Sequence, residues 1–131
     1  MARTLEAVDA ERVAVGAALG VRLHTAREWL YLAYDSKGAT LFDAIHSTPG
    51  YQGVKAPITL YHRYLLEDVP FSLVPIASLG DLLHVPTPTT KSLIQLASVI
   101  HGVDFWKTGR TVEKLGLVGK DVKYIRWLVV R

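Results

Sequence analysis

The feature of this sequence that most constrains its fold is a series of apolar segments with helical periodicity, separated by prolines and glycines. The clearest segment runs from Pro88, which suits the first turn of a helix, to Gly102, which suits its end. Its apolar residues follow the i, i+3, i+4, i+7 pattern of one helix face: Leu93, Leu96, Ala97 and Ile100. This pattern predicts an α-helix over residues 88–101.

Two helices are predicted ahead of this segment from the same kind of signal. Residues 5–19 have a broad apolar face, and Gly20 can end the helix. Thr25 is a suitable N-cap for residues 26–36, and Glu28 lies at the third helical position, where it completes a capping box. The N-terminal third is therefore expected to be helical.

The rest of the chain is also predicted to be mainly helical. A short helix is expected over 40–47, followed by a loop over 48–57 and by a helix whose first turn holds Pro70. A short helical turn is expected from Thr111, and residues 120–131 form an amphipathic segment that fits either a helix or a strand. We predict an all-α bundle of about five or six helices, without a βαβ unit.

Bulk properties are consistent with one domain spanning residues 1–131. The chain is 50% hydrophobic and 21% charged, which is a globular composition with a small apolar excess that favours a partner or oligomer. With no cysteine, disulfides and cysteine–zinc sites are excluded. The net charge of +3 is spread along the chain, so it does not indicate nucleic acid. With no apolar leader at the N-terminus and no membrane-length apolar run, a cytoplasmic location is expected.

The most informative charged cluster lies in the stretch HRYLLEDVPFSLVP, residues 62–75, where Arg63, Glu67 and Asp68 precede an apolar run. Arginine presents a planar fork of donors that suits a carboxylate, and aspartate can accept a hydrogen bond from an imidazole. An ordinary alternative is that Glu67 and Asp68 favour the dipole at the N-terminus of the Pro70 helix. Residue chemistry alone leaves both interpretations open.

Other candidate groups are weaker. The histidines are isolated and form no H-x-x-H or H-E-x-x-H pair, so no metal site is predicted: His24, His46, His62, His84 and His101. Of these, His62 is the most notable because it adjoins Arg63. Arg110, in the stretch GRT, fits either an anion contact or a surface turn. The three tryptophans are expected in the core or at an interface: Trp29, Trp106 and Trp127. There is no glycine-rich phosphate fingerprint, so no cofactor is expected to bind this chain alone.

The order of several short motifs resembles the C-terminal domain of the octopine/nopaline (opine) dehydrogenases. These motifs are R-Y-x-x-E-D-V-P at 63–70, V-P-T-P at 85–88 and G-R-T-x-x-x-L-G at 109–116, and the resemblance covers nearly the whole chain. It implies a helical domain similar to the C-terminal domain of 6-phosphogluconate dehydrogenases. It also implies an oxidoreductase that condenses an α-keto acid with an amino acid by using NADH or NADPH.

The same resemblance implies roles for two residues. Arg63 would bind a substrate carboxylate, and Asp68 would pair with a catalytic histidine. The family's Rossmann domain and that histidine have no counterpart in this sequence, so a Rossmann-domain partner is expected, in the same protein or in a second chain. The isolated chain is expected to be inactive. The alternative is a non-catalytic helical module that kept the fold and serves oligomerisation or interaction.

Overall fold

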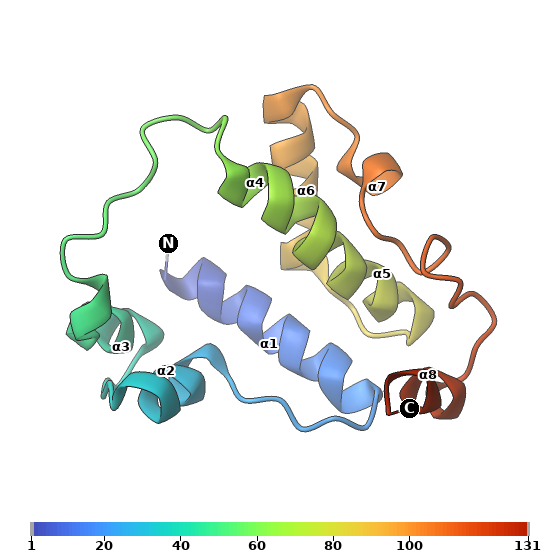
Figure 1. Ribbon diagram of the computed structural model, residues 1–131, viewed down its shortest axis with the longest axis horizontal. Helices are drawn as coiled ribbons and strands as arrows, with labels where there is room; N and C mark the ends of the chain where they lie inside the picture. The colour runs from blue at the N-terminus through green and yellow to red at the C-terminus, as the bar shows by residue number, and fades with distance from the viewer. Residues whose placement is uncertain (1, 131) are drawn as a thin grey trace.

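The computed structural model describes residues 2–130, and the described chain consists of helices joined by turns and loops (Figure 1). In chain order the α-helices are α1 (Ala2–Ala18), α2 (Ala26–Tyr34), α3 (Leu41–Ser47), α4 (Arg63–Asp68), α5 (Val74–Leu82), α6 (Pro88–His101), α7 (Phe105–Thr108) and α8 (Val122–Val129). A 3-10 turn, η1 (Pro49–Tyr51), follows α3, and a π turn, η2 (Val69–Leu73), joins α4 to α5. The predicted all-α architecture is confirmed.

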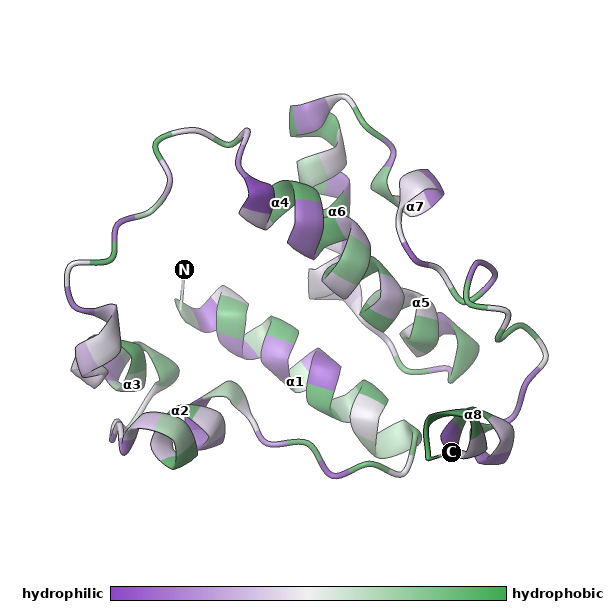
Figure 2. Cartoon of the chain, viewed as in Figure 1, coloured by the Kyte–Doolittle hydropathy of each residue, from purple (hydrophilic) through white to green (hydrophobic). Residues whose placement is uncertain are grey.

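Helix α1 crosses the middle of the molecule, with α2 and α3 on one side and the α4–α5 run with α6 on the other (Figure 1). The core has two parts. Around α5 and α6 it is formed by Val69, Val74, Ala77, Ile94, Ala97 and Phe105, and between α2 and α3 by Leu30, Leu41 and Ala44. Figure 2 shows that α5 is mostly hydrophobic, whereas α4 has hydrophilic residues among its hydrophobic ones. The segment 52–62 connects the two halves as an exposed loop.

Helices α1 and α6 each end at a glycine, as the sequence predicts. At the end of α1, Gly20 adopts a left-handed φ of 69°, and the N–H groups of Gly20 and Val21 return to the carbonyls of Ala17 and Gly16. This is the Schellman arrangement, which favours glycine because its left-handed residue is least strained without a Cβ. Gly102 ends α6 in the same left-handed region, with a φ of 62°. Both predicted stops are confirmed.

The capping box at the start of α2 is confirmed as well. The Thr25 hydroxyl accepts the N–H of Glu28 at 3.1 Å, and the Glu28 carboxylate accepts the N–H of Thr25 at 2.7 Å. The Thr25 hydroxyl also donates to the Glu28 carboxylate, at 3.0 Å, and the bonds from the Thr25 backbone and then its side chain lower the pKa of Glu28. A second box, between Thr40 and Asp43, starts α3.

The prediction that Pro70 begins a new helix was wrong. The N–H of Val69 donates to the carbonyl of Leu65, so the helix that starts at Arg63 continues through η2 into α5. Proline lacks an N–H and its ring crowds the carbonyl four residues earlier, which an α-helix cannot absorb without distortion. Here the backbone widens by one residue into a π turn, and the N–H of Val74 bonds to the carbonyl of Val69.

The π turn leaves one carbonyl to be satisfied from elsewhere. Its next bond would join the Pro70 carbonyl to the N–H of residue 75, but that residue is a proline. The backbone N–H of Arg110 takes its place, at 3.0 Å from the Pro70 oxygen. Gly109 permits this approach, because a Cβ there would lie 2.8 Å from the same oxygen. The stretch 109–111 is thus fastened to the bulge in the helix.

Two C-terminal predictions have different outcomes. From Thr111 the chain makes a single helical turn, in which the N–H of Leu115 donates to the Thr111 carbonyl at 3.0 Å, but residues 112–116 remain turns and do not extend into a helix. The segment from Lys120, whose sequence fits either a helix or a strand, forms the helix α8, and its N-cap Asp121 accepts the N–H of Tyr124 at 2.7 Å. Ile125 is the buried residue of α8.

Carboxylates on α1 cap the helices that surround it. Glu6 accepts the N–H of Leu41, the first residue of α3, at 3.1 Å. Asp9 accepts the N–H of Ala26, the first residue of α2, at 2.7 Å. Each carboxylate supplies an acceptor to an N–H group that has no partner within its own helix. Helix α1 is therefore bound to its neighbours by polar bonds as well as by packing.

The third such carboxylate, Glu11, caps α6. It accepts the N–H groups of Thr89 and Thr90 at 2.8 and 2.9 Å, and the Thr90 hydroxyl at 2.6 Å. Thr87, which occupies the N-cap position itself, makes no side-chain capping bond. Burial alone would raise the pKa of Glu11, but the hydrogen bonds from Thr90 and Thr89 outweigh it and the pKa is lowered.

Candidate functional site

Arg63 and Asp68 are the first and last residues of α4, and both are exposed. The helix starts at Arg63 because His62 adopts an extended backbone and its Nδ1 accepts the N–H of Tyr64 at 3.3 Å. It is anchored at the other end by Val69 and Pro70, which are buried directly after Asp68. A solvated, charged turn is thus fixed to the core by the apolar residues behind it.

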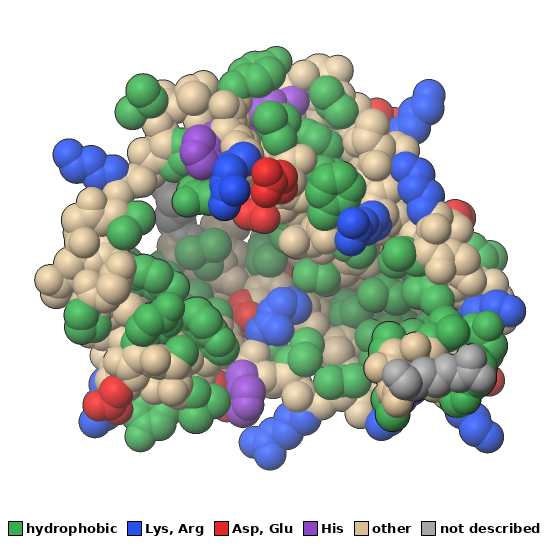
Figure 3. Space-filling model, in the orientation of Figure 1, with side chains coloured by type: hydrophobic (Ala, Val, Ile, Leu, Met, Phe, Trp, Pro, Cys, Tyr) green, Lys and Arg blue, Asp and Glu red, His purple; other side chains and the backbone are tan. Residues whose placement is uncertain are grey.

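Arg63 and Asp68 lie on well-separated faces of α4 and not on the same stripe. Five residues at about 100° each place the two side chains about 140° apart around the helix axis. Glu67, four residues after Arg63, is closer to its stripe. On the face shown in Figure 3, basic and acidic side chains lie next to each other over α4, at the edge of a hollow in the surface. A ligand in front of α4 could therefore meet charges of both signs.

The aromatic neighbours of this turn are also exposed. The Arg63 guanidinium lies 5.8 Å from the centre of the Tyr64 ring, and the Arg110 guanidinium lies 5.1 Å from the centre of the Phe71 ring. The Arg110 backbone bond to Pro70 brings this second arginine to the helix that carries Arg63 and Asp68. Local sequence is compatible with either an anion contact or a surface turn at Arg110, because no local signal connects this residue with Pro70.

The capping interpretation of Glu67 and Asp68 does not hold. Since α4 continues into η2 and α5, there is no helix N-terminus at Pro70 for their charges to favour. Asp68 makes no side-chain capping bond at η2. Its carboxylate is exposed and free to meet a group outside the described residues.

No histidine of the described residues hydrogen-bonds Asp68. His62 caps α4, and His46 contacts Phe42, with its Nδ1 2.8 Å from the Phe42 carbonyl oxygen. His101 is buried, and its ring packs 4.9 Å from the Tyr61 ring, measured between centroids. His84, at the end of α5, and His24, before α2, are both exposed.

The tryptophans divide between core and surface. Trp106 packs on the core around α5 and α6, whereas Trp29 and Trp127 are about half exposed, at 48% and 46%. Within residues 2–130, no group of three or more histidine or acidic side chains is placed to hold a metal ion. None of the described helices is both long and apolar enough to span a membrane.

Comparison with known proteins connects this helical chain to a family. A profile described as the NAD/NADP octopine/nopaline dehydrogenase, alpha-helical domain, matches residues 1–101. The chain belongs to this family. It is 41% identical over 121 residues to the "Opine dehydrogenase" of Arthrobacter sp. (strain 1C), a match that covers 92% of this chain and 34% of the relative.

Two further relatives agree with this assignment. "Protein ocs" of Agrobacterium tumefaciens (strain Ach5) is 30% identical over 119 residues, covering 91% of this chain and 33% of the relative. "Vitopine synthase" of Allorhizobium ampelinum is 30% identical over 117 residues, covering 89% of this chain and 32% of the relative. The chain thus spans about a third of the length of the curated relatives that it matches.

Proposed function

We propose that this chain is the substrate-binding and catalytic helical domain of an opine-type dehydrogenase, an oxidoreductase that condenses an α-keto acid with an amino acid. The observation that carries the proposal is the exposed pair Arg63 and Asp68 on α4, in a chain that belongs to the family of the opine dehydrogenase helical domain. In this proposal the enzyme acts in the cytoplasm and uses NADH or NADPH.

Arg63 is proposed to hold the keto-acid carboxylate. Its guanidinium is exposed, with the Tyr64 ring as its neighbour, and a planar fork of donors can bind both oxygens of a carboxylate. Asp68 is proposed to orient a histidine supplied from outside this chain and to stabilise the imidazolium that forms when it accepts a proton. A carboxylate next to an imidazole fixes its tautomer and favours its charged form.

The described residues do not fit a nicotinamide dinucleotide on their own. A Rossmann-type site places the pyrophosphate at the carboxyl end of a parallel strand, on a glycine-rich turn. The part of the chain that the structure describes is helical, with no strand, and the sequence lacks that glycine pattern. We therefore propose that a Rossmann domain, in the same protein or in a second chain, binds the cofactor and supplies the hydride.

A chimera tests this proposal directly. The matched third of the Arthrobacter relative is replaced by residues 1–131 of this chain, and NADH oxidation is followed with an α-keto acid and an amino acid together. We expect turnover that requires both substrates. The isolated chain, assayed in parallel, is expected neither to bind NADH nor to oxidise it, since the cofactor site lies elsewhere.

Folding and cofactor binding of the chimera are measured first, by circular dichroism and by NADH fluorescence. A chimera that folds and binds NADH but gives no condensation above background would contradict the catalytic proposal. Failure to fold is resolved by a second arrangement, in which the remaining two thirds of the relative is expressed as a separate chain and mixed with this one.

The alternative is a non-catalytic interaction module, and one observation favours it. Large apolar side chains are exposed along the 52–62 loop, with Ile58 fully exposed and Val54 at 71%. A surface of this kind favours a covering partner. If this surface serves self-association alone, the chimera will be inactive while the isolated chain forms a defined homo-oligomer.

A further inference from the structure

A cationic cleft lies beside α2, on the opposite side of α1 from α4. Its volume is about 440 Å³, and its walls come from the loop before α2, from α2 itself and from the loop that follows. Arg22, Arg27 and Lys37 line it, together with the imidazole-bearing His24. Figure 3 shows a histidine and a basic side chain at the lower edge of the molecule, near the loop that precedes α2.

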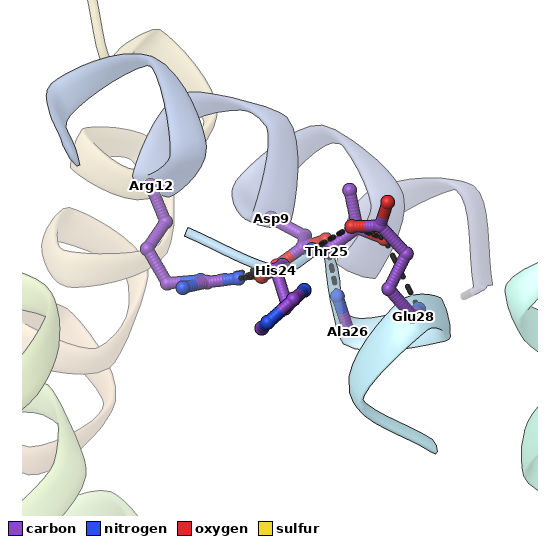
Figure 4. Close-up of polar contacts among 6 residues, drawn as sticks. All are labelled: Asp9, Arg12, His24, Thr25, Ala26 and Glu28. Atoms are coloured by element: carbon purple, nitrogen blue, oxygen red, sulfur yellow. Dashed lines mark hydrogen bonds and ion pairs between the residues drawn. The ribbon is translucent and has the colours of Figure 1, made fainter. Parts of the chain in front are cut away.

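The wall formed by the loop before α2 is held in place from α1. Arg12 donates to the His24 carbonyl at 2.6 Å and to the Asp9 carboxylate at 2.7 Å. The other oxygen of Asp9 accepts the N–H of Ala26. Figure 4 shows this chain of contacts, with the His24 ring pointing away from the Asp9 carboxylate. Backbone hydrogen bonds therefore fix this loop, while the His24 ring remains available to line the cleft.

The opposite wall is held in a similar way. The Arg27 guanidinium donates to the Ala39 carbonyl at 2.6 Å, which ties α2 to the loop after it. In the same loop, the Ser36 hydroxyl lies 2.7 Å from the hydroxyl of Thr48, which directly follows α3, and both residues are buried. Because both walls are anchored, a ligand would not have to order them on binding.

The charge of the cleft matches a dianion. Arg22, Arg27 and Lys37 contribute three positive charges and Glu28 one negative charge, which leaves a net charge of +2. The Glu28 carboxylate is occupied by the Thr25 backbone and hydroxyl, and these bonds lower its pKa, so it is ionised at neutral pH. Asp35 lies 3.8 Å from Lys37, but both side chains are mostly exposed, so solvent weakens this pair.

The cleft also offers apolar surface next to the charges. Tyr31 and Leu32 line it on successive positions of α2, and both side chains are more than half exposed. Its volume is within the range of small-ligand sites, which combine apolar walls with a few charged groups. A ligand with a compact double charge and an apolar group would use both kinds of surface.

We propose that this cleft binds a small phosphate monoester, with the phosphate at Arg22, Arg27 and Lys37 and the apolar group against Tyr31 and Leu32. A phosphate monoester carries close to two negative charges at pH 7, and its three oxygens can accept bonds from several cations at once. The site is separate from the α4 surface, so it does not depend on the proposed dehydrogenase activity.

The test is a titration of the ¹⁵N-labelled chain followed by NMR, at constant ionic strength. The probes are phenyl phosphate, inorganic phosphate and phenyl sulfate, which has the same shape as phenyl phosphate but one negative charge. We expect saturable shifts within residues 22–38, with phenyl phosphate binding most tightly. Phenyl sulfate should bind several-fold more weakly, because only the dianionic phosphate matches the net charge of +2 of the cleft.

Variants separate this site from general attraction of anions. Arg22→Gln and Lys37→Gln should each lower the affinity for phenyl phosphate about two- to fivefold, which is the range for exposed charge pairs. Lys123→Gln, on α8, removes the same charge elsewhere and should leave the affinity unchanged. Tyr31→Ala should reduce the ratio of the affinity for phenyl phosphate to the affinity for inorganic phosphate, because it removes an apolar wall.

Three outcomes would overturn the proposal: equal binding of phenyl phosphate and phenyl sulfate, equal weakening by Lys123→Gln, or shifts spread over all basic residues. Absence of saturable shifts would do so as well. Arg27 is not substituted, because its bond to Ala39 also shapes the cleft.

Discussion

The carboxylate of Glu11 on α1 accepts both the backbone N–H and the hydroxyl of Thr90 on α6, at 2.9 and 2.6 Å. These two residues are far apart in the sequence, and the contact serves as the N-cap that Thr87 does not provide. It joins the central helix to the helix that supplies Ile94 and Ala97 to the core. Glu11 is therefore expected to contribute more to stability than an ordinary exposed glutamate.

Glu11→Ala should lower the free energy of unfolding by about 1–2 kcal/mol, the usual cost of losing a cap. Urea denaturation followed by circular dichroism measures this. Glu67→Ala is the matched control, because Glu67 is exposed on α4 and its loss should change stability by less than about 0.5 kcal/mol. Equal losses in the two variants would show that Glu11 is not acting as a cap.

The Glu11 contact also predicts a pH dependence of stability. Its pKa is lowered in the folded chain, so the folded state binds the proton less readily than the unfolded state. The stabilisation is therefore complete above the unfolded glutamate pKa of about 4.3 and is lost as the pH falls through the lower folded value. Glu11→Gln should flatten the pH dependence of the unfolding free energy below about pH 4.5.

Gly109→Ala should destabilise the fold by about 1–3 kcal/mol, the usual cost of overpacking. An added Cβ would lie 2.6 Å from the Phe105 oxygen and 2.8 Å from both the Pro70 oxygen and the Val74 side chain. Its φ of −72° is suitable for alanine, so the cost is steric. Gly50→Ala is the control: its added Cβ would meet only the Tyr34 ring, at 3.9 Å.

Arg63→Ala and Asp68→Asn should leave the stability of the isolated chain within about 0.5 kcal/mol of the original, because both side chains are exposed. In the active chimera, Arg63→Ala should raise the KM for the keto acid roughly 10- to 200-fold, the equivalent of one charge-assisted hydrogen bond. Asp68→Asn should mainly lower kcat, since the imidazolium forms only during the reaction.

Glu67→Gln in the chimera is the control for these kinetic effects. It removes a charge from the same turn without touching a proposed role. A similar loss of activity in all three variants, or a clear loss of thermal stability in Arg63→Ala and Asp68→Asn, would argue that the charges of α4 are structural.

The isolated chain is expected to associate. Ile58 is fully exposed and Tyr61 is 68% exposed in the loop 52–62, and Val129 is 80% exposed on α8. Covering such a surface is favourable, so a homodimer or larger oligomer should form at high micromolar concentration. Light scattering measures the mass directly, and a stable monomer at that concentration would contradict the prediction.

Part of the fold could be predicted because the relevant interactions are local. The Thr25–Glu28 box, the start of α6 at Pro88 and the stops at Gly20 and Gly102 each depend on residues within one turn of helix. Such interactions need only a side chain that reaches three positions along the chain, or a residue that tolerates a positive φ. The proposed roles of Arg63 and Asp68 came from a motif in the sequence, whereas the exposure of both residues on one short helix came from the structure.

The tertiary structure alone decided whether the helix breaks at Pro70. The sequence supplied Pro70 and Pro75, each of which removes an N–H donor, and a new helix starting at Pro70 was the simplest local solution. The chain instead keeps one helical run, because the Arg110 N–H satisfies the Pro70 carbonyl and Gly109 leaves room for it.

The cationic cleft beside α2 also depends on contacts between residues that are distant in the sequence. Arg12 and Asp9 fix one of its walls from another helix, and bonds between distant residues have no signature in local sequence spacing.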